Sequence, residues 1–293
     1  MEHYEKGLIH CGRTIDAKEL EAIKETVAAF GRLSRSELVL TICEHLEWRS
    51  PSGSLKKDAC EKLLEKLEAQ GVVALPVKRP KVSLAGRKEP KPTQRTEAAE
   101  PVEGSLEGLG PVRLRAVDDK EATGLWNEYM SRYHYLGYKP PIGCFQRYFI
   151  ESGQGILGCL LFAGAAKSLG ERDSWIGWSR PQRQRNLGYV VNNTRFLVFP
   201  WVKVKNLSSH ALGQVARRLG DDWQQRWGYR PVLLETFVDP ERYKGTCYLA
   251  ANWLFLGMTT GHGGMRRGKI YATTPKKILV KPLAEDFRAV LYS

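Results

Sequence analysis

The stretch from Asn193 to Gly263 constrains the fold of this chain more than any other part of the sequence. An apolar run at its start, amphipathic helical spacing over Ser208–Trp227 and a second apolar run at 231–238 indicate strand, helix and strand. A short helix within Gly245–Trp253 and a further strand complete the order. Strands that alternate with helices predict a mixed sheet covered by those helices.

Residues 111–293 form the predicted C-terminal domain, because mixed strand and helix signals replace a polar stretch there. Apolar runs at 144–150, 155–165 and 194–200 indicate successive strands before the second half of the domain. Antiparallel strands followed by strand, helix, strand, helix and strand resemble the GNAT-like fold of the N-acetyltransferases. The resemblance implies a GNAT-like mixed α/β domain and does not fix its function.

The glycine-rich turn with which acetyltransferases of this type hold acetyl-CoA is missing. In those folds the turn brings backbone N–H groups at a helix N-terminus to the pyrophosphate. The corresponding stretch here, Lys205–Ala211, has no glycine, and the Cβ atoms of its residues would crowd that approach. The sequence therefore disfavours acetyl-CoA as the cofactor.

Residues 1–76 predict a small helical domain at the N-terminus. Apolar residues recur at helical spacing over Ala17–Phe30, and a second helix begins at the capping-box pair Ser34 and Glu37. A third helix is expected over Leu55–Gln70, after a break rich in proline, glycine and serine. The chain as a whole is thus α+β, with a helical first domain and a mixed second domain.

A short strand expected at Val72–Leu75 makes the N-terminal order helix, turn, helix and strand, as in a winged helix-turn-helix. In such a module the last helix enters the major groove, and its first residues meet bases and phosphates. Lys56 and Lys57 occupy that position and are candidate DNA contacts. The alternative is a helical bundle whose lysines are only solvated.

The charge of the chain favours a polyanionic partner. Lys and Arg number 45 against 32 Asp and Glu, a formal net charge of +13. Residues 77–110 lose apolar periodicity and indicate a basic flexible linker, which could lie along DNA phosphates. Its candidate contacts are Arg79, Lys81, Arg87 and Lys88. The alternative for the chain is a basic protein without a polyanionic partner. The alternative for residues 77–110 is a linker that is only solvated.

Aromatic residues interleaved with arginines suggest further DNA contacts in the C-terminal domain. Rings that stack on exposed bases beside cationic side chains are typical of single-stranded nucleic-acid binding. A glycine-rich basic segment at 259–269 could add contacts to backbone phosphates. The candidates are Arg172, Trp178, Arg180, Arg183, Arg185, Arg266 and Arg267.

Two groups of polar residues are candidates for chemistry. Glu235 and Asp239 are expected on one face at the end of a strand, where they could hold Mg²⁺ or Mn²⁺ for phosphodiester cleavage. His134 could act as a general base, and Tyr135 or Tyr248 as a nucleophile that forms a phosphotyrosine link. The alternatives are hydrogen-bonded carboxylates on a polar strand, and aromatic rings that stack on bases or pack in the core.

Five uncommon strings occur in order: RYHYLGY (132–138), RDSWIGW (172–178), NNTRFLVFPWVKVKNLSSHAL (192–212), LLETFVD (233–239) and GTCYLAANW (245–253). With them the chain resembles the DruA family, over about residues 111–285. The resemblance implies a role in prokaryotic anti-phage defence, in the Druantia systems, or beside transposase-like genes on mobile elements. It also implies nucleic acid as the partner, and it supplies no catalytic residues.

The leading hypothesis is a cytoplasmic DNA-binding protein of anti-phage defence or mobile-element biology, which engages duplex and exposed single strands beside other defence or transposition proteins. The alternatives are a metal- or tyrosine-dependent DNA strand-cleaving enzyme, transposase- or nickase-like, and last an acetyltransferase. No apolar run approaches the roughly 18–20 residues of a membrane span, and the N-terminus lacks a signal-peptide pattern. Six cysteines without a CxxC pair favour a reducing compartment.

Overall fold

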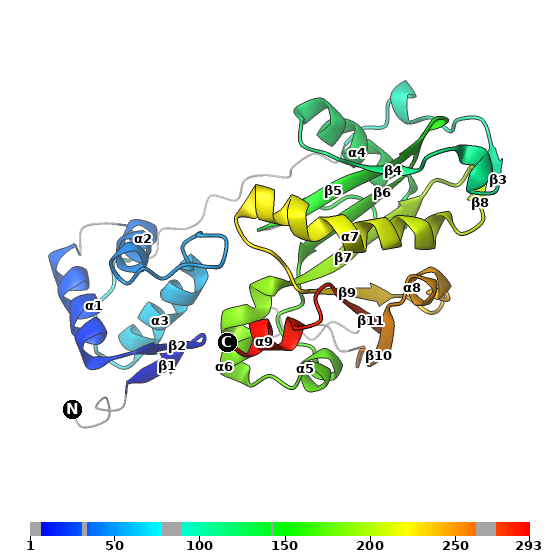
Figure 1. Ribbon diagram of the computed structural model, residues 1–293. Helices are drawn as coiled ribbons and strands as arrows, with labels where there is room; N and C mark the ends of the chain where they lie inside the picture. Colours follow the sequence, from blue (N-terminus) through cyan, green and yellow to red (C-terminus); the bar gives the residue numbers. More distant parts are fainter. Residues whose placement is uncertain (1–6, 31–33, 78–89, 142, 262–273) are drawn as a thin grey trace. The chain divides into compact units, whose positions relative to one another are not determined.

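The computed structural model describes residues 7–30, 34–77, 90–141, 143–261 and 274–293. The chain divides into two compact units, Met1–Arg87 with Ser179–Leu187 and Lys88–Trp178 with Gly188–Ser293 (Figure 1). Each unit has its own hydrophobic core. Within the described ranges, no helix is both long and apolar enough to cross a membrane.

In the described part of residues 1–87, the first unit contains a β-hairpin and three helices, which share one core. Its elements are β1 (Leu8–His10), β2 (Arg13–Ile15), α1 (Ala17–Ala29), α2 (Arg35–His45) and α3 (Lys57–Ala69). The short helix α6 (Arg180–Asn186) also belongs to this unit, although it comes much later in the sequence. The first unit is therefore built from two segments that are far apart in the sequence.

Capping boxes define the starts of α1 and α2. Asp16 accepts a 2.7 Å hydrogen bond from the Glu19 N–H, and Ser34 accepts one of 3.3 Å from the Glu37 N–H. Each glutamate carboxylate accepts from the backbone N–H of its cap residue in return. The three predicted helices are confirmed, with ends within two residues of those expected.

The winged helix-turn-helix prediction is not confirmed. A wing requires strands after the last helix, but in residues 70–77 the chain forms none: Val72–Leu75 is coil that packs partly against the helical core. Among the described residues of this unit, the strands β1 and β2 come before α1 and form an antiparallel hairpin. The helical domain is therefore real, and its assignment to the winged family is unsupported.

The second unit is organised around a seven-stranded mixed sheet in the order β10-β11-β9-β7-β6-β5-β4. Neighbouring strands are antiparallel except β7 and β9, which are parallel. The strands are β4 (Arg113–Ala116), β5 (Phe145–Ser152), β6 (Gly155–Gly164), β7 (Val190–Val198), β9 (Leu233–Val238), β10 (Leu254–Met258) and β11 (Lys277–Pro282). The predicted GNAT-like order of strands is confirmed.

Helices cover both faces of this sheet (Figure 1). The helices outside the first unit are α4 (Lys120–Tyr133), α5 (Gly170–Ile176), α7 (Leu207–Trp227), α8 (Thr246–Ala250) and α9 (Phe287–Tyr292). Short 3-10 turns are η1 (Gln94–Thr96), η2 (Glu107–Leu109) and η3 (Leu187–Tyr189). On β5, Tyr148 donates a 2.6 Å hydrogen bond to Asp222 of α7, whereas Phe149 packs against Tyr129 of α4. Because adjacent strand residues point to opposite faces, α7 and α4 lie on opposite sides.

The second half of the predicted linker packs onto the second unit. Tyr133 of α4 donates a 2.8 Å hydrogen bond to the carbonyl oxygen of Thr96, which is fully buried. Further along, β3 (Val102–Gly104) pairs in parallel with β8 (Val202–Val204). The prediction of a flexible linker is therefore corrected for residues 94–110. The basic residues proposed for its first half, Arg79, Lys81, Arg87 and Lys88, lie outside the described residues.

Candidate functional site

A pocket of about 570 Å³ lies where β7 and β9 diverge. Their parallel pairing ends at Asn193 and Thr236, whereas β7 continues to Val198. The residues beyond that point line the pocket, together with the loop after α4 and the first turn of α8. The cavity thus lies at the carboxyl ends of the two parallel strands, where open α/β sheets commonly bind ligands.

A network of satisfied hydrogen bonds forms one wall of the pocket. Tyr248 of α8 donates a 2.6 Å hydrogen bond to Asn193 Oδ1, and Thr236 Oγ1 donates one of 3.0 Å to the Asn193 carbonyl oxygen. Asn193 Nδ2 donates in turn to the carbonyl oxygens of Leu161 and Arg195, at 3.1 and 2.9 Å. Burial raises the pKa of Tyr248. Its phenol is therefore neutral at physiological pH and held by the neighbouring strand.

His134, at the end of α4, contributes a neutral imidazole to the pocket. Its Nδ1 accepts a 3.2 Å hydrogen bond from the Leu136 N–H, which assigns the ring proton to Nε2. Burial and, to a smaller extent, the positive charge of Arg195 lower the pKa of His134 to about 4. At neutral pH the ring is thus a hydrogen-bond donor through Nε2 and a poor general base.

The rim of the pocket is aromatic and cationic. The rings of Tyr135 and Tyr243 lie 5.7 Å apart, and their residues remain 38% and 53% exposed. The guanidinium of Arg242 lies 5.0 Å from the centre of the Tyr135 ring, and His134 stacks on Tyr135 at 4.9 Å. Lys244, Lys276 and Arg195 supply positive charge in the lining.

Four of the five candidate catalytic residues meet in this pocket: His134, Tyr135, Asp239 and Tyr248. Asp239 follows the last residue of β9, and its Oδ1 accepts a 3.1 Å hydrogen bond from the Glu241 N–H. Because Asp239 lies in a turn and not in the strand, the alternation that predicted a shared face with Glu235 does not extend to it. Glu235 is not part of the lining.

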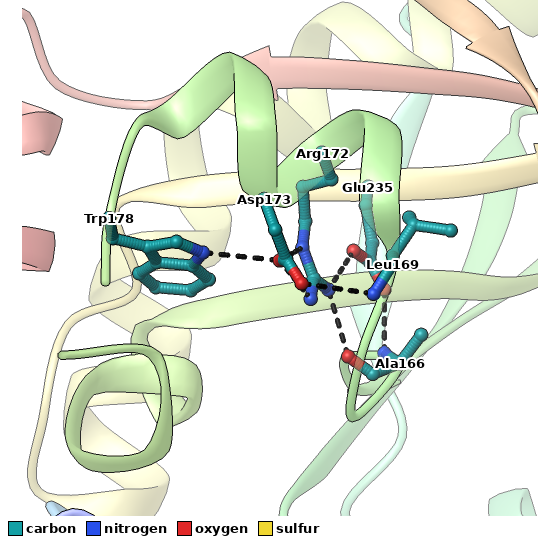
Figure 2. A network of polar contacts seen from close by, with 6 residues as sticks. All are labelled: Ala166, Leu169, Arg172, Asp173, Trp178 and Glu235. Atoms are coloured by element: carbon teal, nitrogen blue, oxygen red, sulfur yellow. Dashed lines mark hydrogen bonds and ion pairs between the residues drawn. The ribbon is translucent and has the colours of Figure 1, made fainter. Parts of the chain in front are cut away.

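Glu235 belongs instead to a buried polar network (Figure 2). The Arg172 guanidinium donates to Glu235 Oε2 at 2.6 Å and to Asp173 Oδ1 at 2.7 Å, and the Ala166 N–H donates to Glu235 Oε1 at 2.7 Å. The indole of Trp178 donates a 3.1 Å hydrogen bond to Asp173 Oδ1. Burial raises the pKa of Glu235, and the charge of Arg172 opposes this shift.

This network corrects three of the predicted site residues. Arg172 is fully buried in ion pairs and Trp178 is buried beside it, so neither can contact DNA. Both oxygens of Glu235 are engaged, so the predicted metal pair with Asp239 does not form. In the part of the chain that the structure describes, no three His, Cys, Asp or Glu side chains gather as a metal site.

The remaining cationic candidates that the structure describes gather in the first unit. Lys56 Nζ lies 3.5 Å from the carbonyl oxygen of Gln184 in α6, and burial together with the charge of Arg185 lowers the pKa of Lys56. Lys57, Arg180 and Arg185 are exposed. The fold thus brings the residues proposed at 56–57 close to α6, which carries Arg180, Arg183 and Arg185. Arg266 and Arg267 lie outside the described residues.

Sequence reasoning missed several lining residues that β7 and the turn after β9 provide. These are Asn192, Asn193, Arg195, Thr236, Tyr243 and Lys244. A usable signal was present: four polar residues, at 192–195, interrupt a strand that is otherwise apolar. Polar side chains inside a central strand require hydrogen-bond partners, and those of Asn193 include Tyr248 of α8 and the Leu161 carbonyl oxygen of β6.

Comparisons with known proteins come from a family model and from solved structures. A model of the family described as Druantia protein DruA matches residues 66–274. A search of curated proteins finds no match. The DruA match covers most of the second unit, including every pocket-lining residue up to Tyr248.

Three of the solved structures that align with the chain are described as acetyltransferases. One from Bacillus subtilis, in complex with CoA, is 9% identical and covers 59% of this chain and 100% of its own, with a TM-score of 0.33. A chimera of the Vibrio cholerae spermidine N-acetyltransferase SpeG is 11% identical, covers 59% and 95%, and has a TM-score of 0.35. A probable GNAT-family protein from Chromobacterium violaceum is 11% identical, covers 72% and 98%, and has a TM-score of 0.36. These values support no conclusion about cofactor or substrate.

Proposed function

Because this chain belongs to the DruA family, we propose that it is a DNA-binding protein of prokaryotic anti-phage defence whose pocket receives an unpaired nucleotide. The observation that carries this proposal is the lining of the pocket between β7 and β9. Two partly exposed tyrosines, Tyr135 and Tyr243, stand beside Arg195, Lys244 and Lys276. An aromatic ring can stack on an exposed base, and a neighbouring cation can bind the phosphate of the same nucleotide.

The size and surroundings of the pocket fit this ligand. Small-molecule sites commonly enclose roughly 300–1,000 Å³, and this pocket encloses about 570 Å³. Stacking of a base on an aromatic side chain contributes about 1–3 kcal/mol. Tyr135 is already held by the stacked ring of His134 and by Arg242, so its side chain loses little conformational freedom when a base binds beside it.

The first unit supports a second contact with DNA, through duplex phosphates. Its cationic surface includes Lys57, Arg180 and Arg185, and the chain carries a net charge of +13. Such contacts give affinity that is largely blind to sequence and weakens with salt. We propose that this unit holds duplex while the pocket engages an exposed strand.

DNA strand cleavage in the same pocket is a second candidate, favoured by the convergence of His134, Tyr135 and Asp239. The protonated Nε2 of His134 could donate to a phosphate oxygen, and Asp239 could bind a divalent cation together with substrate phosphates. Burial and the charge of Asp239 raise the pKa of Tyr135, which opposes its use as a nucleophile. Acetyl transfer ranks last, because α7 begins without a glycine or a side-chain cap.

The test is a titration of fluorescently labelled single-stranded and duplex oligonucleotides by fluorescence anisotropy. The double variant Tyr135→Ala, Tyr243→Ala should bind the single strand about 10-fold or more weakly, from the loss of base stacking. Lys203→Ala is the matched control, because Lys203 is 71% exposed and lies outside the pocket. Equal single-strand affinity of the wild type and the double variant would refute the proposal.

The same samples discriminate between the alternatives. Incubation with Mg²⁺, Mn²⁺ or EDTA followed by a denaturing gel reveals cleavage or a covalent adduct. Cleavage by the wild type that is lost in Asp239→Asn would show that the pocket cleaves DNA strands. Binding without cleavage would support DNA binding alone. A rise in the unfolding temperature of the protein on addition of acetyl-CoA would instead support acetyl transfer.

A further inference from the structure

We infer that a second cavity of the same unit binds backbone phosphates of the unpaired strand whose nucleotide enters the pocket. This inference rests on the proposed function and adds a separate binding site to it. The cavity, called the α7–α8 groove below, has a volume of about 750 Å³ and is lined by one face of α7, the end of α8 and the end of β11. Its lining includes His210, Gly213, Ala216, Arg217, Asn252 and Lys281.

The groove is open because α7 and α8 carry small residues where they line it. Gly213 and Ala216 are three residues apart and therefore share one face of α7. The last residue of α8, Ala250, adds a third small side chain, and α8 packs against α7. Outside the helix backbone, the nearest atom that a Cβ on Gly213 would meet is Arg217 Nη1, at 3.8 Å. A ligand can therefore approach the surface of α7 at this point.

The groove is cationic, and its positive charges have no carboxylate partner. Arg217 is exposed, and Lys281 Nζ donates a 3.2 Å hydrogen bond to the carbonyl oxygen of Asn252, which carries no charge. In the described part of the chain, neither cation forms an ion pair, and no Asp or Glu lines the groove. Two other arginines of α7, Arg218 and Arg226, do pair with aspartates. An anionic ligand would supply the missing partner.

The groove lies next to the pocket along α8. The first three residues of α8 line the pocket, whereas its last residue lines the groove. On α7, Ser208 lines the pocket and Ser209 the groove. Five helical residues span about 7.5 Å. A DNA strand carries a phosphate about every 3.4 Å along a duplex axis, so two or three nucleotides cover this distance. A strand with one nucleotide in the pocket therefore brings its next phosphates to Arg217 and Lys281.

The test measures how affinity for a ten-nucleotide strand of thymidine depends on salt concentration. Each phosphate that a single strand has neutralised contributes about 0.7 to the magnitude of the slope of log K against log salt concentration. Arg217→Gln, Lys281→Gln should therefore lower this magnitude by about 1.4. Arg113→Gln, Lys120→Gln is the matched control. It removes the same charge from two exposed residues outside both cavities and should leave the slope unchanged.

Gly213→Leu tests the groove by filling it, without a change in charge. The position is helical and open, and leucine has a higher helix propensity than glycine, so the variant should fold. It should lower the slope by a similar amount, because the side chain keeps phosphates away from Arg217. A wild-type slope in either the double variant or Gly213→Leu would overturn the inference.

A labelled octaglutamate peptide provides the comparison with an acidic protein partner. Peptide binding that these variants abolish, with strand affinity and slope unchanged, would assign the groove to such a partner and overturn the inference. Failure of the proposed function is distinguishable, because Tyr135→Ala, Tyr243→Ala would then bind the strand as tightly as the wild type. Failure of the groove alone leaves the weaker binding of that variant intact.

Discussion

The Arg172 guanidinium donates a 2.6 Å hydrogen bond to the Glu235 carboxylate, and neither side chain is exposed to solvent. Glu235 lies on β9 directly before Thr236, which lines the pocket, and Arg172 lies in α5. The pair therefore links α5, which follows β6, to β9, which forms one wall of the pocket (Figure 2). Its contribution is to the architecture of the site and not to contact with a ligand.

Loss of this pair should destabilise the protein. Arg172→Met leaves the carboxylates of Glu235 and Asp173 without their common partner, and we expect the free energy of unfolding to fall by about 3–5 kcal/mol. Glu235→Gln should cost less, because Asp173 still neutralises Arg172. Urea denaturation measures both. Glu103→Ala, which breaks the exposed pair with Lys203, is the control and should change stability by less than about 1 kcal/mol.

His134 should make stability depend on pH below neutrality. Its pKa of about 4 in the folded protein lies below the ordinary value of 6.5, so the unfolded chain binds the proton more readily. This contribution to stability is complete above pH 6.5 and is lost as the pH falls from 6.5 to 4, with a total of roughly 3 kcal/mol. Denaturation at a series of pH values should show a shallower dependence in His134→Gln. An unchanged pH profile in that variant would contradict the burial of a neutral imidazole.

Tyr248→Phe should separate structural from chemical roles of the phenol. The change removes the donor to Asn193 Oδ1 and leaves a buried acceptor unpaired, at a cost of about 1–3 kcal/mol in unfolding free energy. Single-strand affinity should change less than in Tyr135→Ala, Tyr243→Ala, because the phenol is already bound within the protein. A protein–DNA adduct in the wild type that disappears in Tyr248→Phe would instead identify Tyr248 as a nucleophile.

Duplex affinity should respond to the cations of the first unit. Each phosphate contact contributes about 0.9 to the slope of log K against log salt concentration, so Lys57→Ala, Arg180→Ala should lower that slope by roughly 2. Both residues are exposed. Lys18→Ala, an exposed residue of α1 in the same unit, is the control and should leave the slope unchanged. A slope that is equal in all three proteins would place the duplex contact elsewhere.

Local features of this chain were predictable, and its long-range contacts were not. The starts of α1 and α2 follow from capping residues three positions apart, so sequence alone locates them. One ion-pair partner of Arg172 is Glu235, 63 residues away, and no local pattern indicates that this arginine is buried. The pocket likewise joins the end of α4 to the end of β9.

The prediction that Glu235 and Asp239 bind one metal ion is wrong because β9 ends one residue before Asp239. Alternation along a strand predicts a shared face for Glu235 and Asp239 only if the strand continues through both residues. β9 ends at Val238, and Asp239 accepts backbone hydrogen bonds from Arg242 and Tyr243 in the turn that follows. The two carboxylates are therefore separated, one in a buried ion pair and the other in the pocket.

The most direct test of a nucleotide in the pocket is photochemical cross-linking mapped by mass spectrometry. A single strand that contains 5-iodocytosine reacts on irradiation with aromatic side chains that contact the base. The account predicts cross-linked peptides at Tyr135 or Tyr243, which line the pocket and are partly exposed. Cross-links confined to peptides outside the pocket, with none at either tyrosine, would contradict it.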